Sequence, residues 1–154
     1  MLQRWRPAAV VAAVLAGINL VGRLVGWRLG HGDERRLTRI GLVEVAVVAL
    51  VLVYAGYRWA CRRPMPRVFG ELSVAVLVGL VFSFAVGPYA GGSAPFVEGG
   101  ALVYAEAWHY LVLAAVGIGF GVLVAMALGR DWKSQAYKRY AESRQGRPRR
   151  PVRR

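Results

Sequence analysis

Four long apolar runs dominate the chain, and short polar segments separate them. They cover residues 7–27, 40–59, 68–87 and 101–129. Each run reaches about 20 residues, the length at which an α-helix crosses a hydrocarbon layer of about 30 Å. None keeps a polar face at helical spacing, as the surface helices of a water-soluble bundle do. Since lipid cannot satisfy an open backbone, all four runs are expected to be helices.

The pattern predicts an all-α integral membrane protein, with a four-helix bundle of up-down topology over residues 1–129. Residues 130–154 form a basic tail that is expected to be disordered from about residue 146, where Arg and Pro dominate. The first run also resembles the apolar segment of a signal peptide, because the basic stretch MLQRWR precedes it. No convincing cleavage site follows, so an uncleaved helix is predicted.

Positive charge is in large excess. The 154 residues are 56% hydrophobic, and 21 Lys and Arg against 8 Asp and Glu give a formal net charge of +13. Such an excess is typical either of nucleic-acid binding or of membrane proteins with basic flanks. Here most basic residues lie between or beyond the apolar runs. This layout favours the membrane and argues against a nucleic-acid partner.

The loops predict the orientation of the bundle. Residues 58–67 contain four Arg and no acid, the tail is strongly basic, and residues 88–100 contain no basic residue. By the positive-inside rule, both termini are therefore cytoplasmic. Residues 28–39 conflict with this orientation, because they carry four Arg on the predicted outer side. Composition rich in Arg, Ala, Val and Gly suggests a GC-rich bacterium, so a bacterial plasma membrane is the expected location.

Two charged residues interrupt the first two runs at nearly matching depth. Arg23 lies about 24 Å past Pro7, and Glu44 lies about 20 Å from the same end of the bundle. An unpaired charge in a membrane helix costs about 2.5–3.5 kcal/mol, so we predict that Arg23 and Glu44 pair across the first hairpin. In the alternatives, Arg23 extends to the outer interface and Glu44 is protonated. Glu71, near the inner end, is expected to be hydrated.

Glu106 and His109 share one face of the fourth run, at i, i+3 spacing. Di-metal helical bundles use this motif, but they need a second copy and further carboxylates. We therefore predict no metal or cofactor, and we favour an aromatic belt at the membrane interface. Arg23, Glu44, Glu106 and His109 all fall in the outer half of the bundle. A shared polar pocket there is the place where chemistry is to be sought.

Small residues recur every four positions in three of the runs. This spacing lets helix backbones approach closely in lipid. The predicted packing residues are Ala9, Ala13 and Gly17 in the first run, Ala75, Gly79 and Ser83 in the third, and Gly117, Gly121 and Ala125 in the fourth. Packing within one bundle is the favoured interpretation, and contact with a helix of a partner is the alternative.

The start of the tail, residues 131–144, is predicted to be a helix on the inner membrane surface. Its basic residues Lys133, Lys138 and Arg139 would attract anionic headgroups. Cys61 is the only cysteine, so no intramolecular disulfide forms.

Three functions remain open. A non-enzymatic accessory or assembly subunit, bound to another membrane protein or to a second copy, ranks first because no catalytic constellation is present. A small oligomeric ion- or proton-coupled transporter or channel using Glu44 ranks second. A membrane redox or metal-binding protein using Glu106 and His109 ranks third.

Overall fold

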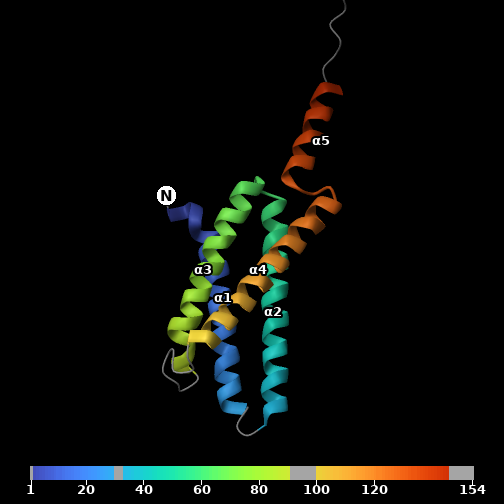
Figure 1. The fold of residues 1–154 in the computed structure, drawn as a ribbon. Helices are drawn as coiled ribbons and strands as arrows, with labels where there is room; N and C mark the ends of the chain where they lie inside the picture. The colour runs from blue at the N-terminus through green and yellow to red at the C-terminus, as the bar shows by residue number, and fades with distance from the viewer. Residues whose placement is uncertain (1, 30–32, 91–99, 146–154) are drawn as a thin grey trace, which may run out of the picture.

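The described part of the chain folds into five α-helices, four of which form a bundle (Figure 1). The structure is a computed structural model and describes residues 2–29, 33–90 and 100–145. The helices are α1 (Leu2–Leu29), α2 (Glu34–Ala60), α3 (Met65–Ala90), α4 (Gly100–Ala127) and α5 (Trp132–Gln145). No strand occurs in the described residues, so the predicted all-α bundle is confirmed. The predicted disorder from about residue 146 lies outside the described part of the chain.

Four of the helices have the length and the hydropathy of membrane spans. Large apolar side chains are exposed on the outer faces of all four, among them Val10, Leu50, Val81 and Phe120. Such extensive apolar exposure is costly in water but ordinary against lipid tails. The chain is therefore a small multi-pass membrane protein.

The helices extend beyond the apolar runs where polar residues cap them. α2 begins at Glu34 rather than at residue 40, because the side chain of Asp33 accepts hydrogen bonds from the backbone N–H groups of Arg35 (3.0 Å) and Arg36 (3.3 Å). These bonds satisfy donors that the first helical turn leaves unpaired. The carboxylate of Glu34 in that turn also interacts favourably with the positive end of the helix dipole.

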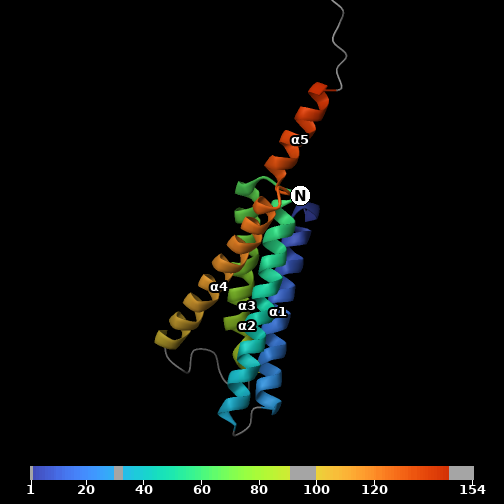
Figure 2. The same cartoon turned by 90° about the vertical axis from the view of Figure 1, so that its right-hand side faces the viewer.

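The closest helix pairs are not the sequential hairpins. α1 packs mainly against α3 and α2 mainly against α4, whereas α3 and α4 touch little. In each close pair the two helices run in the same direction (Figure 1). Figure 2 shows that α4 is inclined to the other three and diverges from them toward its first turns. We call the end with the α2–α3 and α4–α5 connections the basic end.

Glycines of α4 bring its backbone against α2. A methyl group on Gly121 would overlap the carbonyl oxygen of Val53 and would lie 2.8 Å from the backbone nitrogen of Tyr57. A methyl group on Gly117 would lie 3.0 Å from Cβ of Leu52. Only glycine therefore fits at Gly121, because backbone atoms cannot move aside as a flexible side chain can.

The facing surface of α2 uses small residues in the same way. A methyl group on Gly56 would lie 3.1 Å from Cα of Ile118, and Ala60 has no exposed surface. Ala125 of α4 is equally buried. Gly56 and Ala60 were not predicted as packing residues, since the second run shows no long stripe of small residues.

The three predicted small residues of α3 are buried within the bundle. Ala75 and Ser83 are buried, and a methyl group on Gly79 would lie 3.4 Å from Cβ of Leu15. A large side chain of α1 thus fills the space that a glycine of α3 leaves open, which is close packing without a cavity.

The predicted stripe of α1 does not face α3. Ala9 and Ala13 are exposed, and no atom lies within 4 Å of a methyl group placed on Gly17. The buried residues of α1 are Ala8, Val11, Ala12 and Leu15. The expected face is rotated by one position, about 100° around the helix. Small residues occupy both faces, so their spacing alone could not select the buried one.

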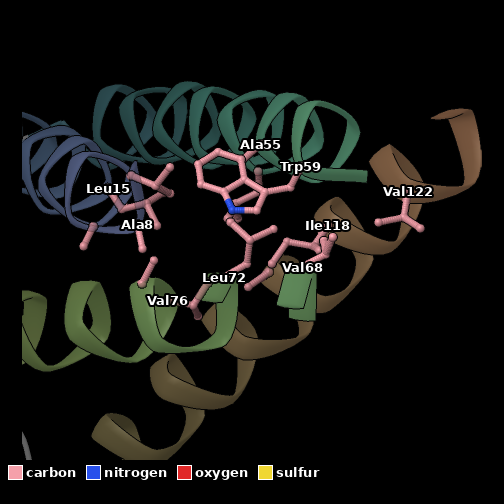
Figure 3. Packing of buried hydrophobic residues seen from close by; sticks show 14 of the residues in the cluster. Ala8, Leu15, Ala55, Trp59, Val68, Leu72, Val76, Ile118 and Val122 are labelled. Carbon is pink, nitrogen blue, oxygen red and sulfur yellow. The ribbon is translucent and has the colours of Figure 1, made fainter. Parts of the chain in front are cut away.

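The core near the basic end surrounds the indole of Trp59. Figure 3 shows Trp59 of α2 next to Ala55 and above Leu72 and Val68 of α3, with Ile118 of α4 close by. Residues of all four long helices contribute to this cluster. It is where the bundle is packed most completely.

Glu71 is part of this core, so the expectation that it is hydrated is wrong. Glu71 is only 6% exposed. The indole Nε1 of Trp59 donates a hydrogen bond of 3.1 Å to Oε2 of Glu71, and the guanidinium of Arg63 forms an ion pair with the same oxygen. Cζ of Arg63 also lies over the Trp59 ring, 5.4 Å from its centroid. This distance is within the range of a cation–π contact, about 6 Å. These partners compensate for the loss of water around the carboxylate.

α5 leaves the basic end after a tight turn. Gly129 has φ +61°, its N–H donates to the carbonyl of Met126 (2.9 Å), and the N–H of Arg130 donates to the carbonyl of Ala125 (3.0 Å). This is the Schellman arrangement, which closes α4. Asp131 then accepts a hydrogen bond from the backbone N–H of Ser134. The side-chain hydroxyl of Ser134, followed by neighbouring backbone N–H groups, lowers the pKa of Asp131.

Figures 1 and 2 show α5 projecting away from the bundle. The sequence predicted instead a helix lying across the membrane surface. Its direction follows from the turn at Gly129 and the cap at Asp131, neither of which amphipathicity reveals. Lys133, Lys138 and Arg139 are exposed on it.

Gly121→Ala should destabilise the bundle, because the added methyl group overlaps the backbone of α2. Overpacking of this kind costs about 1–3 kcal/mol. Thermal unfolding of the protein in mild detergent measures the effect. Gly119→Ala is the matched control on the same helix, since no atom lies within 4 Å of its methyl group. Equal midpoints for the two variants would contradict the α2–α4 contact.

Arg63→Ala should destabilise the fold by about 3 kcal/mol, because it leaves the Glu71 carboxylate buried without its cation. Combining Arg63→Met with Glu71→Gln should recover most of this loss. The double variant removes both charges and keeps an acceptor for the Trp59 indole. Chemical unfolding in detergent, followed by tryptophan fluorescence, compares the variants. A double variant as unstable as Arg63→Ala would show that the ion pair is not the cause.

Candidate functional site

A cavity of about 840 Å³ lies in the half of the bundle away from the basic end. It is found where α4 diverges from the other helices (Figure 2). All four long helices line it, and its polar lining residues are Asn19, Arg23, Glu44, Ser83, Glu106, His109 and Tyr110. The volume falls in the range of small-molecule sites, roughly 300–1,000 Å³. We call it the outer-half cavity.

Arg23 of α1 crosses the outer-half cavity to reach α4. Its Nη2 lies 3.5 Å from Oε2 of Glu106, and its Nε donates a hydrogen bond of 3.3 Å to Oδ1 of Asn19. The guanidinium passes over Gly87 of α3, where a methyl group would lie 2.7 Å from Nε. Gly87 therefore provides the space that lets the ion pair form.

Glu44 of α2 packs on Gly22 of α1, the neighbour of Arg23 in sequence. A methyl group on Gly22 would overlap the Glu44 carboxylate. The carboxylate is close enough to Arg23 and Glu106 to interact electrostatically with both. Among the ion pairs of the described residues, however, Arg23 pairs with Glu106 and not with Glu44.

The structure thus differs from the pair expected across the first hairpin. Glu44 and Arg23 nevertheless both line the outer-half cavity. Depth along two helices could not show that Gly87 opens a path from Arg23 to the fourth helix. Glu44 is left as the acid of this cavity without an ion-pair partner among the described residues.

His109 lies one turn from Glu106 and also lines the outer-half cavity. Its Nδ1 is 2.6 Å from the carbonyl oxygen of Ala105. A carbonyl only accepts, so Nδ1 carries the hydrogen in this contact. Nε2 is then the remaining ring nitrogen for a ligand or a proton. Within residues 2–29, 33–90 and 100–145, no group of three or more His, Cys, Asp or Glu side chains is arranged to hold a metal ion.

Tyr110 and Asn19 belong to the site although the sequence did not assign them to it. The hydroxyl of Tyr110 lies 3.1 Å from where a methyl group on Gly79 would be, so the ring spans from α4 toward α3. Asn19 holds the guanidinium of Arg23 from the preceding turn of α1. The i, i+4 spacing of Asn19 and Arg23 was the available signal for that bond.

The charges of the cavity favour a positively charged or protonated occupant. The Arg23–Glu106 pair is neutral as a unit, and Glu44 adds one further carboxyl group. Apolar side chains of α2, α3 and α4 complete the walls, among them Val48, Phe84 and Leu113. The site therefore suits a group that has one cationic centre and an apolar body.

Comparison with known proteins adds no assignment. The chain matches no protein-family model, no curated protein and no solved structure. The function must be argued from the geometry of the site.

Exchanging the charges of Arg23 and Glu106 should restore what either single reversal disrupts. Arg23→Glu and Glu106→Arg each place like charges together across α1 and α4, so each should lower the yield of monodisperse protein in detergent. The double variant recreates an ion pair and should recover the yield. Arg23→Glu with Glu44→Arg is the matched comparison. Better recovery in that comparison would show that Arg23 pairs with Glu44 instead.

Proposed function

We propose that this protein is a small transporter of the plasma membrane that binds an organic cation in the outer-half cavity and exchanges it for a proton at Glu44. One observation carries the proposal. Glu44 lines a cavity of about 840 Å³ within a membrane-spanning bundle, and Arg23, the only Arg or Lys among the described lining residues, pairs with Glu106. Ionisable residues inside membrane helices mark ion, proton or substrate pathways by default.

Exchange follows from competition for one carboxyl group. A cation stabilises the ionised form of Glu44, and a proton neutralises it, so the two occupants exclude each other. The Arg23–Glu106 pair supports this competition because Arg23 forms its ion pair with Glu106 and not with Glu44, although it lies near Glu44. Without Glu106, Arg23 would pair with Glu44 and would neutralise its charge permanently.

Glu44 is also accessible from the lipid side. It contributes to a second, apolar groove of about 650 Å³ between α1 and α2, with Val14, Gly17 and Val43 among the other lining residues. An amphipathic cation partitions into a bilayer with its apolar body in the hydrocarbon. The groove gives such a ligand a lateral path to the carboxylate.

Positive charge supports the orientation that transport requires. The basic end carries Arg58, Arg62, Arg63, Arg67 and Arg130. The positive-inside rule favours this end in the cytoplasm, with both termini there and the cavity in the outer half. The location in a bacterial plasma membrane rests on composition and stays part of the proposal.

An accessory or assembly subunit is the second candidate, although the sequence alone ranked it first. The observation in its favour is that Ala9 and Ala13 of the predicted stripe are exposed on the surface of α1. Small residues on a lipid-facing helix allow a partner helix or a second copy to approach closely. The outer-half cavity reverses the order, because a purely structural subunit does not require a polar cavity.

Glu44→Gln should weaken binding of tetraphenylphosphonium, a lipophilic cation, by about tenfold or more, since it removes the unpaired negative charge. Quenching of tryptophan fluorescence in detergent measures the dissociation constant. Wild-type binding should also release protons into a weakly buffered solution and should tighten as pH rises, because fewer protons then compete.

Glu34→Gln is the control, since this acid lies in the first turn of α2 outside the cavity. The proposal fails if Glu44→Gln binds the cation as tightly as the wild type. It also fails if the anion tetraphenylborate binds equally well, because the cavity would then select for apolar bulk and not for charge.

A further inference from the structure

A second cavity, of about 410 Å³, lies at the opposite end of the bundle. The end of α2, the α4–α5 turn and α5 enclose it. Its lining residues are Tyr57, Arg58, Cys61, Arg62, Gly129, Arg130, Gln135 and Lys138. Four of them are cationic, and none of these described lining residues is acidic. We call it the basic pocket.

The pocket is held open by hydrogen bonds between segments far apart in sequence. Nη1 of Arg130 donates to the hydroxyl of Tyr57 (3.2 Å), and Nε2 of Gln135 donates to the carbonyl of Cys61 (3.2 Å). These bonds fix α5 against the end of α2. The cationic side chains are therefore brought together by the fold and not by chance proximity on one helix.

None of the four cations forms an ion pair with a described residue. Arg58 and Arg130 are held by hydrogen bonds to the hydroxyls of Tyr54 and Tyr57, whereas the side chains of Arg62 and Lys138 are not held in this way. Nζ of Lys138 lies 4.0 Å from where a methyl group on Gly129 would be, so this side chain folds back over the turn. Arg62 lines the same space from the end of α2. The ion pairs of the described residues include neither Arg62 nor Lys138. Converging like charges repel each other unless an anion lies between them.

We propose that the basic pocket binds the phosphate of an anionic phospholipid headgroup. Phosphate is the anion that Arg and Lys side chains recognise through several charge-assisted hydrogen bonds. A volume of about 410 Å³ accommodates a phosphate with a small polar headgroup. Basic pockets among the ends of membrane helices recognise lipid headgroups in this manner.

The surroundings of the pocket identify a lipid, rather than free phosphate, as the source of the anion. The pocket lies at the level where α4 ends and the apolar span gives way to polar sequence. Exposed apolar side chains lie beside it, Tyr54 one turn before Arg58 and Leu128 directly before Gly129. A headgroup in the pocket would place its acyl chains along these side chains, in the hydrocarbon.

This site is distinct from attraction of the tail to a charged surface. The strength of diffuse attraction depends on the total number of cations near the membrane surface. The strength of binding in the basic pocket depends on the particular cations that line it. It is also spatially separate from the outer-half cavity, because the two cavities share no described lining residue.

The test compares lipids on the full-length protein in mild detergent, with native mass spectrometry counting bound molecules. Short-chain phosphatidylglycerol should bind at least tenfold more tightly than phosphatidylcholine of the same chain length. Replacing the two cations that no tyrosine hydroxyl holds, Arg62→Gln with Lys138→Gln, should weaken phosphatidylglycerol binding about tenfold or more. Arg67→Gln with Lys133→Gln removes the same charge outside the pocket and should change binding less than threefold.

Three results would overturn the proposal. Equal affinity of the wild type for the two lipids would remove the headgroup preference, and this comparison needs no variant to fold. An equal loss of phosphatidylglycerol affinity in the two double variants would show that the protein attracts the lipid only through its overall charge. Displacement of phosphatidylglycerol by millimolar inorganic phosphate would assign the pocket to a soluble anion. Should the Arg62 and Lys138 double variant aggregate, Lys138→Gln alone carries the same comparison against Lys133→Gln.

Discussion

The structure depends on the backbone contact between α2 and α4. Hydrophobic burial does not drive helices together in lipid, so close packing has to do so. Gly121 of α4 lies against the carbonyl of Val53, and Gly56 of α2 lies against the backbone of Ile118. This contact holds the second half of α4 near the basic end. Because α4 is inclined, its first half separates from the other helices, and the outer-half cavity occupies that separation (Figure 2). The contact also determines where the Gly129 turn leaves α4, and so places Arg130 over Tyr57.

Glycine serves a second purpose in this bundle, which is to make room for charge. Gly22 accommodates the Glu44 carboxylate and Gly87 accommodates the Arg23 guanidinium. A helix that crosses lipid can hold such groups only if they are paired or lie in a cavity. A glycine on one helix thus leaves the space that a long charged side chain of a neighbouring helix occupies. By contrast, the ion pair of Glu71 and Arg63 at the basic end is built inside the packed core, with an indole as a further donor.

Sequence pattern predicted the helices well and the contacts between them only in part. Length and hydropathy are properties of single segments, so four spans could be recognised before any packing was known. The gathering of Glu44, Glu106 and His109 in one cavity also followed from depth along each helix. Depth did not predict three other features, namely the partner of Arg23, the burial of Glu71 and the exposure of Ala9 and Ala13. Each of these features depends on the rotation of one helix about its axis relative to another. One residue of rotation, about 100°, exchanges a lipid-facing side for a packed one.

The two cavities have opposite charge character, and this difference bears on how a cation would move. Glu44 lies three turns or more before Tyr57 on the same rigid helix, a separation of about 20 Å. A cation held at Glu44 therefore meets increasing repulsion toward the basic end, where Arg58, Arg62 and Arg130 converge. A phosphate in the basic pocket would neutralise part of this field and lower the repulsion for release on that side. Lipid binding at one end and cation binding at the other would then be coupled through the field along α2, without any change in helix packing.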